Sequence, residues 1–212
     1  MARRYPPPEP PNEVSLFGGP ALGQGRAAAA ASVGFPYLGA RLAVGALSWL
    51  DLGLQVESVY GSLTDVRATA RAQLLNGGGW ALGVVADGGP AFFVQPAQVE
   101  RRGLRWLTGR RNWNTAPGLV VSFQGQNPRA SRLFLDARVS FAFDTEPFQR
   151  DPLGGVPAAV QVSWNVPVRM GAEIPFSRWT SILFSFGFDA HTRPDDSTLM
   201  PTLTLGLVTS LF

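Results

Sequence analysis

The sequence predicts an all-β fold, an antiparallel up-and-down transmembrane β-barrel of about ten strands, with eight or twelve strands as alternatives. Apolar and polar residues alternate strictly over residues 160–174, which is the pattern of a strand with one apolar and one polar face. Charged residues make up only 16% of the chain, against roughly 25% in an average soluble domain. Helical periodicity is absent, and no run of about eighteen apolar residues could form a transmembrane helix.

The chain divides into a short tail and one long β domain. Residues 1–12 are rich in proline and lack a hydrophobic pattern, which predicts an extended tail. A barrel domain is expected over residues 13–212, because barrels of this size are commonly single domains. The ten predicted strands lie near residues 13–19, 30–47, 50–60, 66–75, 80–88, 118–126, 132–144, 158–174, 180–190 and 199–212.

Alternation is clearest in four of these segments. Residues 50–57 and 66–74 place apolar side chains at even positions and polar or small residues at odd ones. Residues 132–144 place their apolar side chains at odd positions, and residues 182–188 set three phenylalanines on one face. The phase of the alternation changes near Pro36, which predicts a β-bulge within the second strand.

The predicted links between strands alternate in length along the chain. Tight turns at one end of a meander and longer loops at the other are the layout of an outer-membrane barrel. The tight links are residues 48–49, 76–79, 127–131 and 175–179, and the mostly longer links are residues 20–29, 61–65, 89–117, 145–157 and 191–198.

A soluble barrel of lipocalin or streptavidin type is the alternative, with its apolar face turned inward. The low charge, the Gly, Ser and Thr on the polar faces, and strand lengths that fit a tilted membrane crossing favour lipid on the outside. Tryptophans near the tight turns also fit the aromatic girdle of a membrane interface. The predicted girdle residues are Trp49, Trp164 and Trp179.

The last predicted strand runs from Thr202 to Phe212 and contains Gly206. This alternating segment, which ends on phenylalanine, resembles the carboxy-terminal signal read by the barrel-assembly machinery of bacterial outer membranes. With the meander, the resemblance to the outer-membrane β-barrel superfamily covers about residues 13–212 and points to no particular member. It implies an outer-membrane location with both termini in the periplasm. The implied partners are outer-membrane lipid, lipopolysaccharide and the barrel-assembly machinery.

If lipid lies outside, the polar faces line the lumen and bring five arginines together with five carboxylates. One interpretation is an ion-pair network that fills the barrel and satisfies its own charges, and the other is the charged constriction of a narrow pore. Eight-stranded barrels are filled by side chains whereas sixteen strands leave a channel, so ten strands are nearer the filled case. The predicted lumen residues are Arg41, Asp51, Glu57, Arg67, Arg71, Asp136, Arg138, Arg169, Glu173 and Asp189.

Two sets of contacts are predicted among these charges. A symmetric hairpin register would place Glu57 diagonal to both Arg67 and Arg71. A similar register would place Asp136 near Arg169. Diagonal neighbours on one face of a sheet lie about 7 Å apart, which long side chains can span.

The longest predicted loop, residues 89–117, combines clustered arginine with tryptophan. Arginine clusters suit phosphate groups, and on the outer surface the nearest phosphates belong to lipopolysaccharide. The alternative is that the loop folds over or into the barrel and pairs its charges locally, and nucleic acid is not expected as a partner. The loop residues concerned are Arg101, Arg102, Arg105, Trp106, Arg110, Arg111 and Trp113.

Catalytic chemistry has few candidates in this sequence. The single histidine, His191, lies near Asp195 and Asp196, which is similar to the rim residues of omptin proteases and lipid A-modifying barrels. A lone histidine in a turn with aspartate is more often merely solvated, so no enzyme is expected. One histidine and no cysteine exclude a multi-histidine or cysteine-ligated metal site, and no cofactor is expected.

Three hypotheses for function follow from these patterns. The first is a structural or anchoring barrel with a filled, charged lumen, which serves a larger envelope complex through its loops or tail. The second is a narrow porin-like channel for small solutes or ions. The third is an outer-rim enzyme that modifies lipid or peptide.

Overall fold

The computed structural model describes residues 14–59, 63–93, 111–125, 127, 130–144, 161–191 and 199–212. Every regular element within these ranges is a β-strand. The same residues contain no helix that is long and apolar enough to cross a membrane. The strands are β1 (Ala27–Phe35), β2 (Leu38–Leu47), β3 (Leu50–Val59), β4 (Leu63–Gly77), β5 (Trp80–Phe93), β6 (Arg111–Thr115), β7 (Gly118–Gln124), β8 (Arg132–Arg138), β9 (Ser140–Asp144), β10 (Gln161–Pro175), β11 (Thr180–His191) and β12 (Leu199–Ser210).

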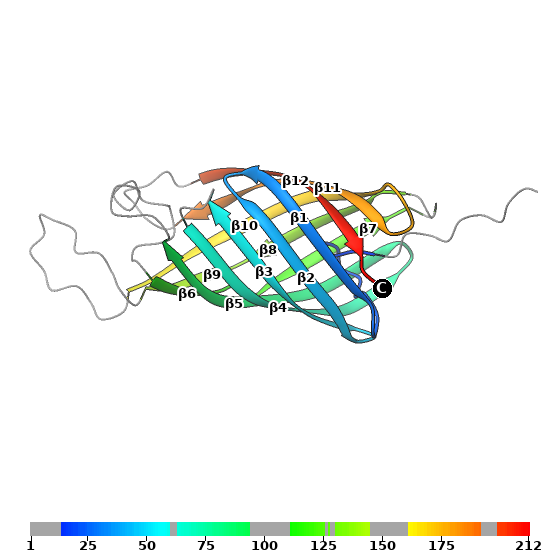
Figure 1. Ribbon diagram of the computed structural model, residues 1–212, viewed down its shortest axis with the longest axis horizontal. Coiled ribbons are helices and arrows are strands. Elements are labelled where there is room, and N and C mark those ends of the chain that lie inside the picture. Colours follow the sequence, from blue (N-terminus) through cyan, green and yellow to red (C-terminus); the bar gives the residue numbers. More distant parts are fainter. Residues whose placement is uncertain are drawn as a thin grey trace, which may run out of the picture.

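The strands form one closed antiparallel barrel with ten strand positions around its circumference (Figure 1). Two positions are each occupied by a pair of short strands, because β6 and β7 both pair with β5, and β8 and β9 both pair with β10. β11 pairs with β10, and β12 closes the circle by pairing with β1. The break between β6 and β7 contains Pro117, which has no N–H to donate to a neighbouring strand. The predicted ten-stranded antiparallel barrel is confirmed.

The first predicted strand, residues 13–19, is wrong. Its described residues are not part of the wall, and residues 16–20 form bends inside the barrel. The run Gly18-Gly19-Pro20 explains the difference, because glycine and proline favour turns and interrupt a ladder of strand hydrogen bonds.

The second predicted strand, residues 30–47, is also wrong in its continuity. It contains two antiparallel strands, β1 and β2, which pair with each other on either side of Pro36. The phase change at this proline therefore marks a hairpin and not a bulge, and the bond between Phe35 and Pro36 is cis. One strand too many at the start and one too few here leave the predicted count of ten unchanged.

The predicted loop over residues 89–117 is shorter in the structure. β5 continues to Phe93, and β6 begins at Arg111 and pairs with both β5 and β9. The prediction ended this strand at Gly88, directly before Gly89 and Pro90, which interrupt the apolar pattern.

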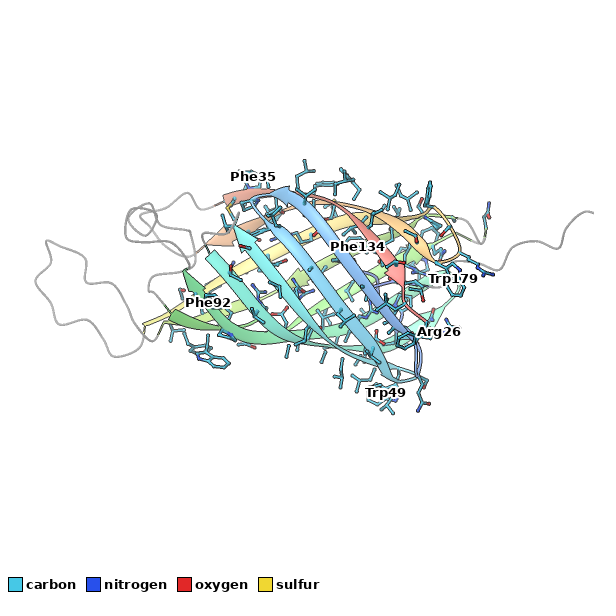
Figure 2. The ribbon with its side chains drawn as sticks, in the orientation of Figure 1. Arg26, Phe35, Trp49, Phe92, Phe134 and Trp179 are labelled. Carbon is cyan, nitrogen blue, oxygen red and sulfur yellow. The ribbon has the colours of Figure 1, made fainter. Side chains whose placement is uncertain are left out.

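Side chains of opposite character line the two surfaces of the wall (Figure 2). On β12, Leu203, Leu205 and Leu207 are each at least half exposed on the outside, whereas Thr202 is buried on the inside. Arg71 on β4 is among the most buried side chains. A polar interior within an apolar outer surface is the distribution of a transmembrane barrel and the reverse of a soluble one.

The two ends of the barrel differ in their connections (Figure 1). At one end, called the turn end below, two-residue turns link β2 to β3 and β4 to β5. The chain terminus lies there too, since the amide of Ala27 donates to the carbonyl of Phe212 at 3.2 Å. The opposite end, where β1 turns into β2, is called the loop end.

The outward aromatic residues lie at several heights on the barrel. Trp49 and Trp179 are about half exposed near the turn end, and Trp164 is equally exposed on β10 opposite Phe141 (Figure 2). Trp113, from the predicted arginine-rich loop, lies on β6 and is also exposed. The role of the first three as a membrane girdle stays a prediction.

The predicted assembly signal lies on the last strand. Gly206 pairs with Ser32 of β1, and a Cβ atom added at Gly206 would lie 2.6 Å from the carbonyl oxygen of Ala31. Phe212 is 72% exposed at the turn end. Recognition of this strand by assembly machinery stays a prediction.

Candidate functional site

The lumen is the candidate functional site, because the inward faces of the strands gather the charged side chains there. Nine of the ten predicted lumen residues take part in ion pairs with other lumen residues. The tenth, Arg41, holds its guanidinium 5.5 Å from the centre of the Phe17 ring. Three charged residues outside the predicted set also take part, namely Asp65, Asp87 and Arg132.

A group of six charges spans the middle of the lumen toward the loop end and is called the charge network. Asp87 on β5 is its centre, with a fully buried side chain that pairs with Arg67 of β4 at 3.3 Å and with Arg138 of β8. Arg138 also pairs with Asp136 at 2.5 Å. The members of the charge network are Glu57, Asp65, Arg67, Asp87, Asp136 and Arg138.

Arg67 has several partners within the charge network. It pairs closely with Asp65 on its own strand and lies 3.8 Å from Glu57 on β3. Asn114 of β6 donates an amide hydrogen bond to Asp65 at 3.3 Å. Arg67 therefore keeps carboxylate partners if one of them is removed.

The register corrects one of the predicted contacts and changes the partners of another. Arg71 lies directly opposite Asp51, so it is not diagonal to Glu57, although Arg67 is. Arg169 and Asp136 are opposite each other, as a similar register predicts. Even so, the ion pair of Arg169 is with Asp189 of β11 at 2.5 Å, and Asp136 pairs with Arg138.

Tyr37 lies in the turn between β1 and β2 at the loop end. The charged groups that act on its hydroxyl are Glu57, Arg67, Arg169 and Asp189. Burial of the hydroxyl raises the pKa of Tyr37 well above its usual value, and the carboxylates of Asp189 and Glu57 raise it further. The phenol therefore stays neutral at physiological pH.

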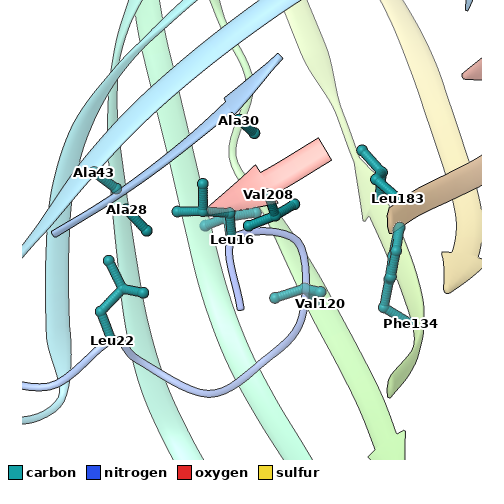
Figure 3. Close-up of a cluster of buried hydrophobic side chains, with 10 residues drawn as sticks. Leu16, Leu22, Ala28, Ala30, Ala43, Val120, Phe134, Leu183 and Val208 are labelled. Atoms are coloured by element: carbon teal, nitrogen blue, oxygen red, sulfur yellow. The ribbon is translucent and has the colours of Figure 1, made fainter. Parts of the chain in front are cut away.

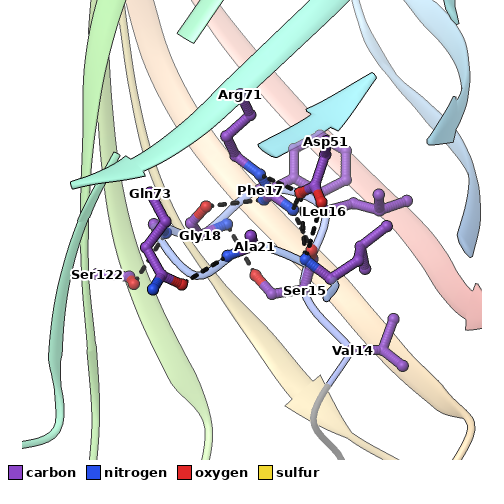
Figure 4. A network of polar contacts seen from close by, with 12 residues as sticks. Val14, Ser15, Leu16, Phe17, Gly18, Ala21, Asp51, Arg71, Gln73 and Ser122 are labelled. Carbon is purple, nitrogen blue, oxygen red and sulfur yellow. Dashed lines mark hydrogen bonds and ion pairs between the residues drawn. The ribbon is translucent and has the colours of Figure 1, made fainter. Parts of the chain in front are cut away.

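The turn end of the lumen is filled in another way, by the chain itself. Residues 14–22 enter the barrel before β1 and are called the plug segment (Figures 3 and 4). Glu173 of β10 binds it with both carboxylate oxygens, accepting from the Ser15 hydroxyl at 2.5 Å and from the amides of Leu16 and Phe17 at 2.9 and 3.1 Å. Three donors on one buried carboxylate make this a strong, charge-assisted anchor.

Arg71 is the second anchor of the plug segment (Figure 4). The Nε–Nη2 edge of its guanidinium pairs with Asp51 of β3, at 2.5 Å from Nη2. The same group donates to the carbonyl oxygens of Ser15 and Gly18 at 2.7 and 2.8 Å. Arginine suits this position because its planar fork can serve a carboxylate and two carbonyls together.

Further side chains on the wall strands bind the backbone of the plug segment. Ser122 of β7 accepts from the amide of Gly19 at 3.0 Å, and Gln73 of β4 accepts from the amide of Ala21 at 2.9 Å. Asp51 accepts from the amide of Leu22 at 3.0 Å. Arg132 of β8 donates to the carbonyl of Val14 at 3.2 Å.

The apolar side chains of the plug segment pack on the remaining walls (Figure 3). Leu16 is 1% exposed and Leu22 is 4% exposed, and both belong to one buried cluster. Phe17 stacks on Phe134 of β8 with ring centres 6.1 Å apart. Small residues on the facing strands provide the room, and the wall members of the cluster are Ala28, Ala30, Ala43, Val85, Val120, Phe134, Leu183 and Val208.

The sequence did not lead to a prediction of the plug segment or of three charged lumen residues, for different reasons. Asp87 and Arg132 lie within the predicted strands 80–88 and 132–144 and follow the parity of the inward faces, so applying the alternation to every charged residue of these strands would have found them. Asp65 lies one residue before the predicted strand 66–75, and extending that strand by one residue would have found it. The plug segment carries no such signal, since its apolar residues resemble those of a short strand.

Several predicted residues lie wholly or partly outside the described part of the chain. These include Asp195, Asp196, Arg101, Arg102, Arg105, Trp106 and Arg110. For His191 and Arg111 the structure describes the backbone, in β11 and β6. Their catalytic and phosphate-binding roles stay predictions. Among the described residues, no group of three or more His, Asp or Glu is arranged to hold a metal ion.

No family model and no curated protein sequence matches the chain. Among solved structures, the chain is similar to the crystal structure of Acinetobacter baumannii CarO, with 11% sequence identity and a TM-score of 0.32. That match covers 86% of this chain and 96% of the CarO chain.

Proposed function

We propose that this protein is an integral barrel of a bacterial outer membrane, closed at its turn end by its own plug segment, with a structural or anchoring role in the envelope. The observation that carries the proposal is the plug segment, which contacts walls all around the turn end of the lumen. The plug segment is bonded to β3, β4, β7, β8 and β10 and packs on β1, β2 and β12. A barrel built to conduct continuously would leave this space to water.

The proposed orientation places the turn end in the periplasm. Outer-membrane barrels have short periplasmic turns and longer external loops. The plug segment and the C-terminal residue both lie at the turn end, so the N-terminal tail and the chain terminus would face periplasmic partners. The arginine-rich residues 101–111 would then face lipopolysaccharide on the other side.

A narrow channel is the second candidate function. The observation that favours it is the charge of the lumen, where, among the described residues, twelve inward-facing charged side chains take part in ion pairs. Apolar side chains would fill a purely structural barrel without charges that must be desolvated and paired. The two candidates differ in whether the intact protein conducts.

Membrane insertion is tested by adding a charge to each face of one strand. Leu205→Arg places a guanidinium on the exposed outer face in the middle of β12, and Thr204→Arg places it on the opposite face. Leu205→Arg is expected to cost about 2 to 4 kcal/mol of folding free energy in lipid vesicles if this residue lies near the bilayer midplane. Equal effects at the two positions would contradict lipid on the outside.

Closure is tested by recording from the intact protein in planar bilayers. The structural proposal expects no steady conductance from the purified full-length chain. Steady, ohmic conductance would overturn it in favour of the narrow channel. Heat-modified migration on gels provides the control that the protein tested is folded.

A further inference from the structure

The plug segment binds the barrel without contributing charge to it. Residues 14–22 contain no ionisable side chain, and they bind through backbone groups, one hydroxyl and apolar side chains. The two anchors are charged, but each already has a partner in the wall. Arg71 pairs with Asp51 at 2.5 Å, and Glu173 lies 3.6 Å from Arg132.

This arrangement has an energetic consequence for departure of the plug segment. Removing one partner of a buried ion pair is strongly destabilising, because it leaves an uncompensated charge. Here the plug segment can leave while each anchor keeps its ion-pair partner, and water can solvate the freed amides and carbonyls. Each of the two anchors therefore keeps a neutralising ion pair in the wall with or without the plug segment.

The wall behind the plug segment is suited to an opening. On β1 and β2 the residues that face it are the small Ala28, Ala30 and Ala43. On the other strands, apolar residues such as Val120 and Phe134 alternate with polar ones, including Gln73 and Ser122. An emptied turn end would thus have a mixed lining, with small side chains on β1 and β2 and polar groups that water can solvate on the other strands.

The plug segment is joined covalently to β1 by the short link of residues 23–26. Gly23 and Gly25 both have positive φ angles, +88° and +78°, which glycine adopts without strain. From Gly25 onward the chain is bonded to β2, with the Gly25 amide donating to the carbonyl of Gly45 at 2.9 Å. Residues before Gly23 can therefore move as a unit while the barrel stays intact.

We infer that the plug segment is the gate of a pore, and that its displacement toward the turn end opens the barrel to small ions. This rests on the proposed function, in which the resting barrel is closed. Three guanidinium groups and two carboxylates surround the emptied space, those of Arg41, Arg71, Arg132, Asp51 and Glu173. Because guanidinium groups outnumber carboxylates by one there, the open pore is expected to pass small anions somewhat better than small cations.

The test displaces the plug segment in the full-length protein by one substitution. Leu16→Glu puts a carboxylate at a site that is 1% exposed, next to Glu173. The control, Ser48→Glu, adds the same charge at the same end, in an exposed turn outside the lumen. In planar bilayers, Leu16→Glu is expected to raise the open fraction by about tenfold or more, because an unpaired buried charge costs several kcal/mol. Wild type and Ser48→Glu are expected to stay closed.

A synthetic peptide provides the reverse experiment. A peptide of residues 13–23 with the natural sequence, added on the turn side, is expected to close Leu16→Glu pores. The same peptide with glutamate at position 16 is expected to have no effect. Closure by both peptides or by neither would contradict specific binding in the lumen.

Position of the plug segment is measured with a single thiol. The sequence has no cysteine, so Ala21→Cys, which leaves the Ser15 hydroxyl and both anchors in place, reports exposure of the plug segment to a membrane-impermeant maleimide. If Leu16→Glu exposes this thiol and the folded barrel stays silent, the plug segment is only a filler and the inference fails while the proposed function stands. If the wild-type protein conducts as much as Leu16→Glu, the proposed function itself fails.

A second variant covers the case in which Leu16→Glu does not fold. Ser15→Ala keeps the apolar contacts but removes the hydroxyl that donates to Glu173 and accepts from the amide of Gly18. A smaller increase in open fraction is expected. No increase in open fraction, with the thiol reporter at position 21 exposed, would overturn the gate.

Discussion

The two halves of the lumen are filled by different kinds of contact. At the turn end a backbone segment enters the barrel, and each anchor of that segment is almost fully buried: Arg71 is 2% exposed and Glu173 is 1% exposed. Toward the loop end, wall side chains pair with one another, and Glu57 keeps 32% of its side-chain surface exposed. The difference teaches that each anchor at the turn end has a single ion-pair partner in the wall, whereas the ion pairs of the charge network overlap.

The number of ion-pair partners that a residue has decides how much stability is lost when one partner is substituted. Arg67 has three carboxylate partners and Asp87 has two arginines. Removal of one partner leaves the others in place, and partial exposure lets water replace what is lost. At the turn end, the same removal leaves a buried group with no substitute, which is the more costly case.

Arg71→Met is expected to have the largest effect. It leaves Asp51 buried without its guanidinium and removes the donors to Ser15 and Gly18. The expected loss is about 3 to 5 kcal/mol of the free energy of unfolding, as for other broken buried pairs. Urea titration of the barrel in lipid vesicles measures it. The double variant with Asp51→Asn should recover part of the loss.

Leu16→Ala tests the apolar contribution at the turn end. Leu16 is 1% exposed in the cluster of Figure 3, and truncation of such a leucine typically costs about 2 to 5 kcal/mol. The lower part of that range is expected, because water can enter this end of the lumen. Val14→Ala, at a half-buried position of the same segment, is the control and should cost less.

Gly19→Ala tests how closely the plug segment approaches the wall. An added Cβ would lie 2.7 Å from the carbonyl oxygen of Ala81, which belongs to the backbone of β5. A strain of about 1 to 3 kcal/mol is expected, as in other overpacked sites. Gly77→Ala is the matched control, because nothing lies within 4 Å of a Cβ at that position. Equal stability of the two variants would show that the plug segment is loosely held.

Glu57→Gln is expected to have the smallest effect, and it tests the loop end. The Glu57 carboxylate is 3.8 Å from Arg67, which keeps Asp65 and Asp87 as partners. The expected change in unfolding free energy is under about 1 kcal/mol. A loss as large as that of Arg71→Met would erase the difference between the two ends.

Local pattern was sufficient for the strands that form most of the wall. In β10 and β12 the alternation of apolar and polar residues identifies both the strand and the direction of each side chain, because that direction depends only on the backbone period. The same reasoning selected Arg67, Asp136 and Asp189 as lumen residues from their position alone. Low charge added the expectation of lipid outside.

Local pattern was insufficient where the environment comes from distant residues. Residues 14–22 look like a short strand, but their bonds come from far along the chain: Ser15 binds Glu173, 158 residues away. Apolar residues occur both on the wall strands and in a segment inside the lumen, so the composition of a short segment does not show which of the two it is. The closed barrel is needed before the plug segment has anything to bind.

The sequence by itself determined an all-β barrel of about ten strands, its apolar outer face and most of its inward charges, because a side chain's direction on a strand is a local property. Only the tertiary structure decided which guanidinium meets which carboxylate and that residues 14–22 lie inside. Pairing depends on the register between strands, and the place of the plug segment depends on closure of the barrel. Neither is encoded in the period of any single strand.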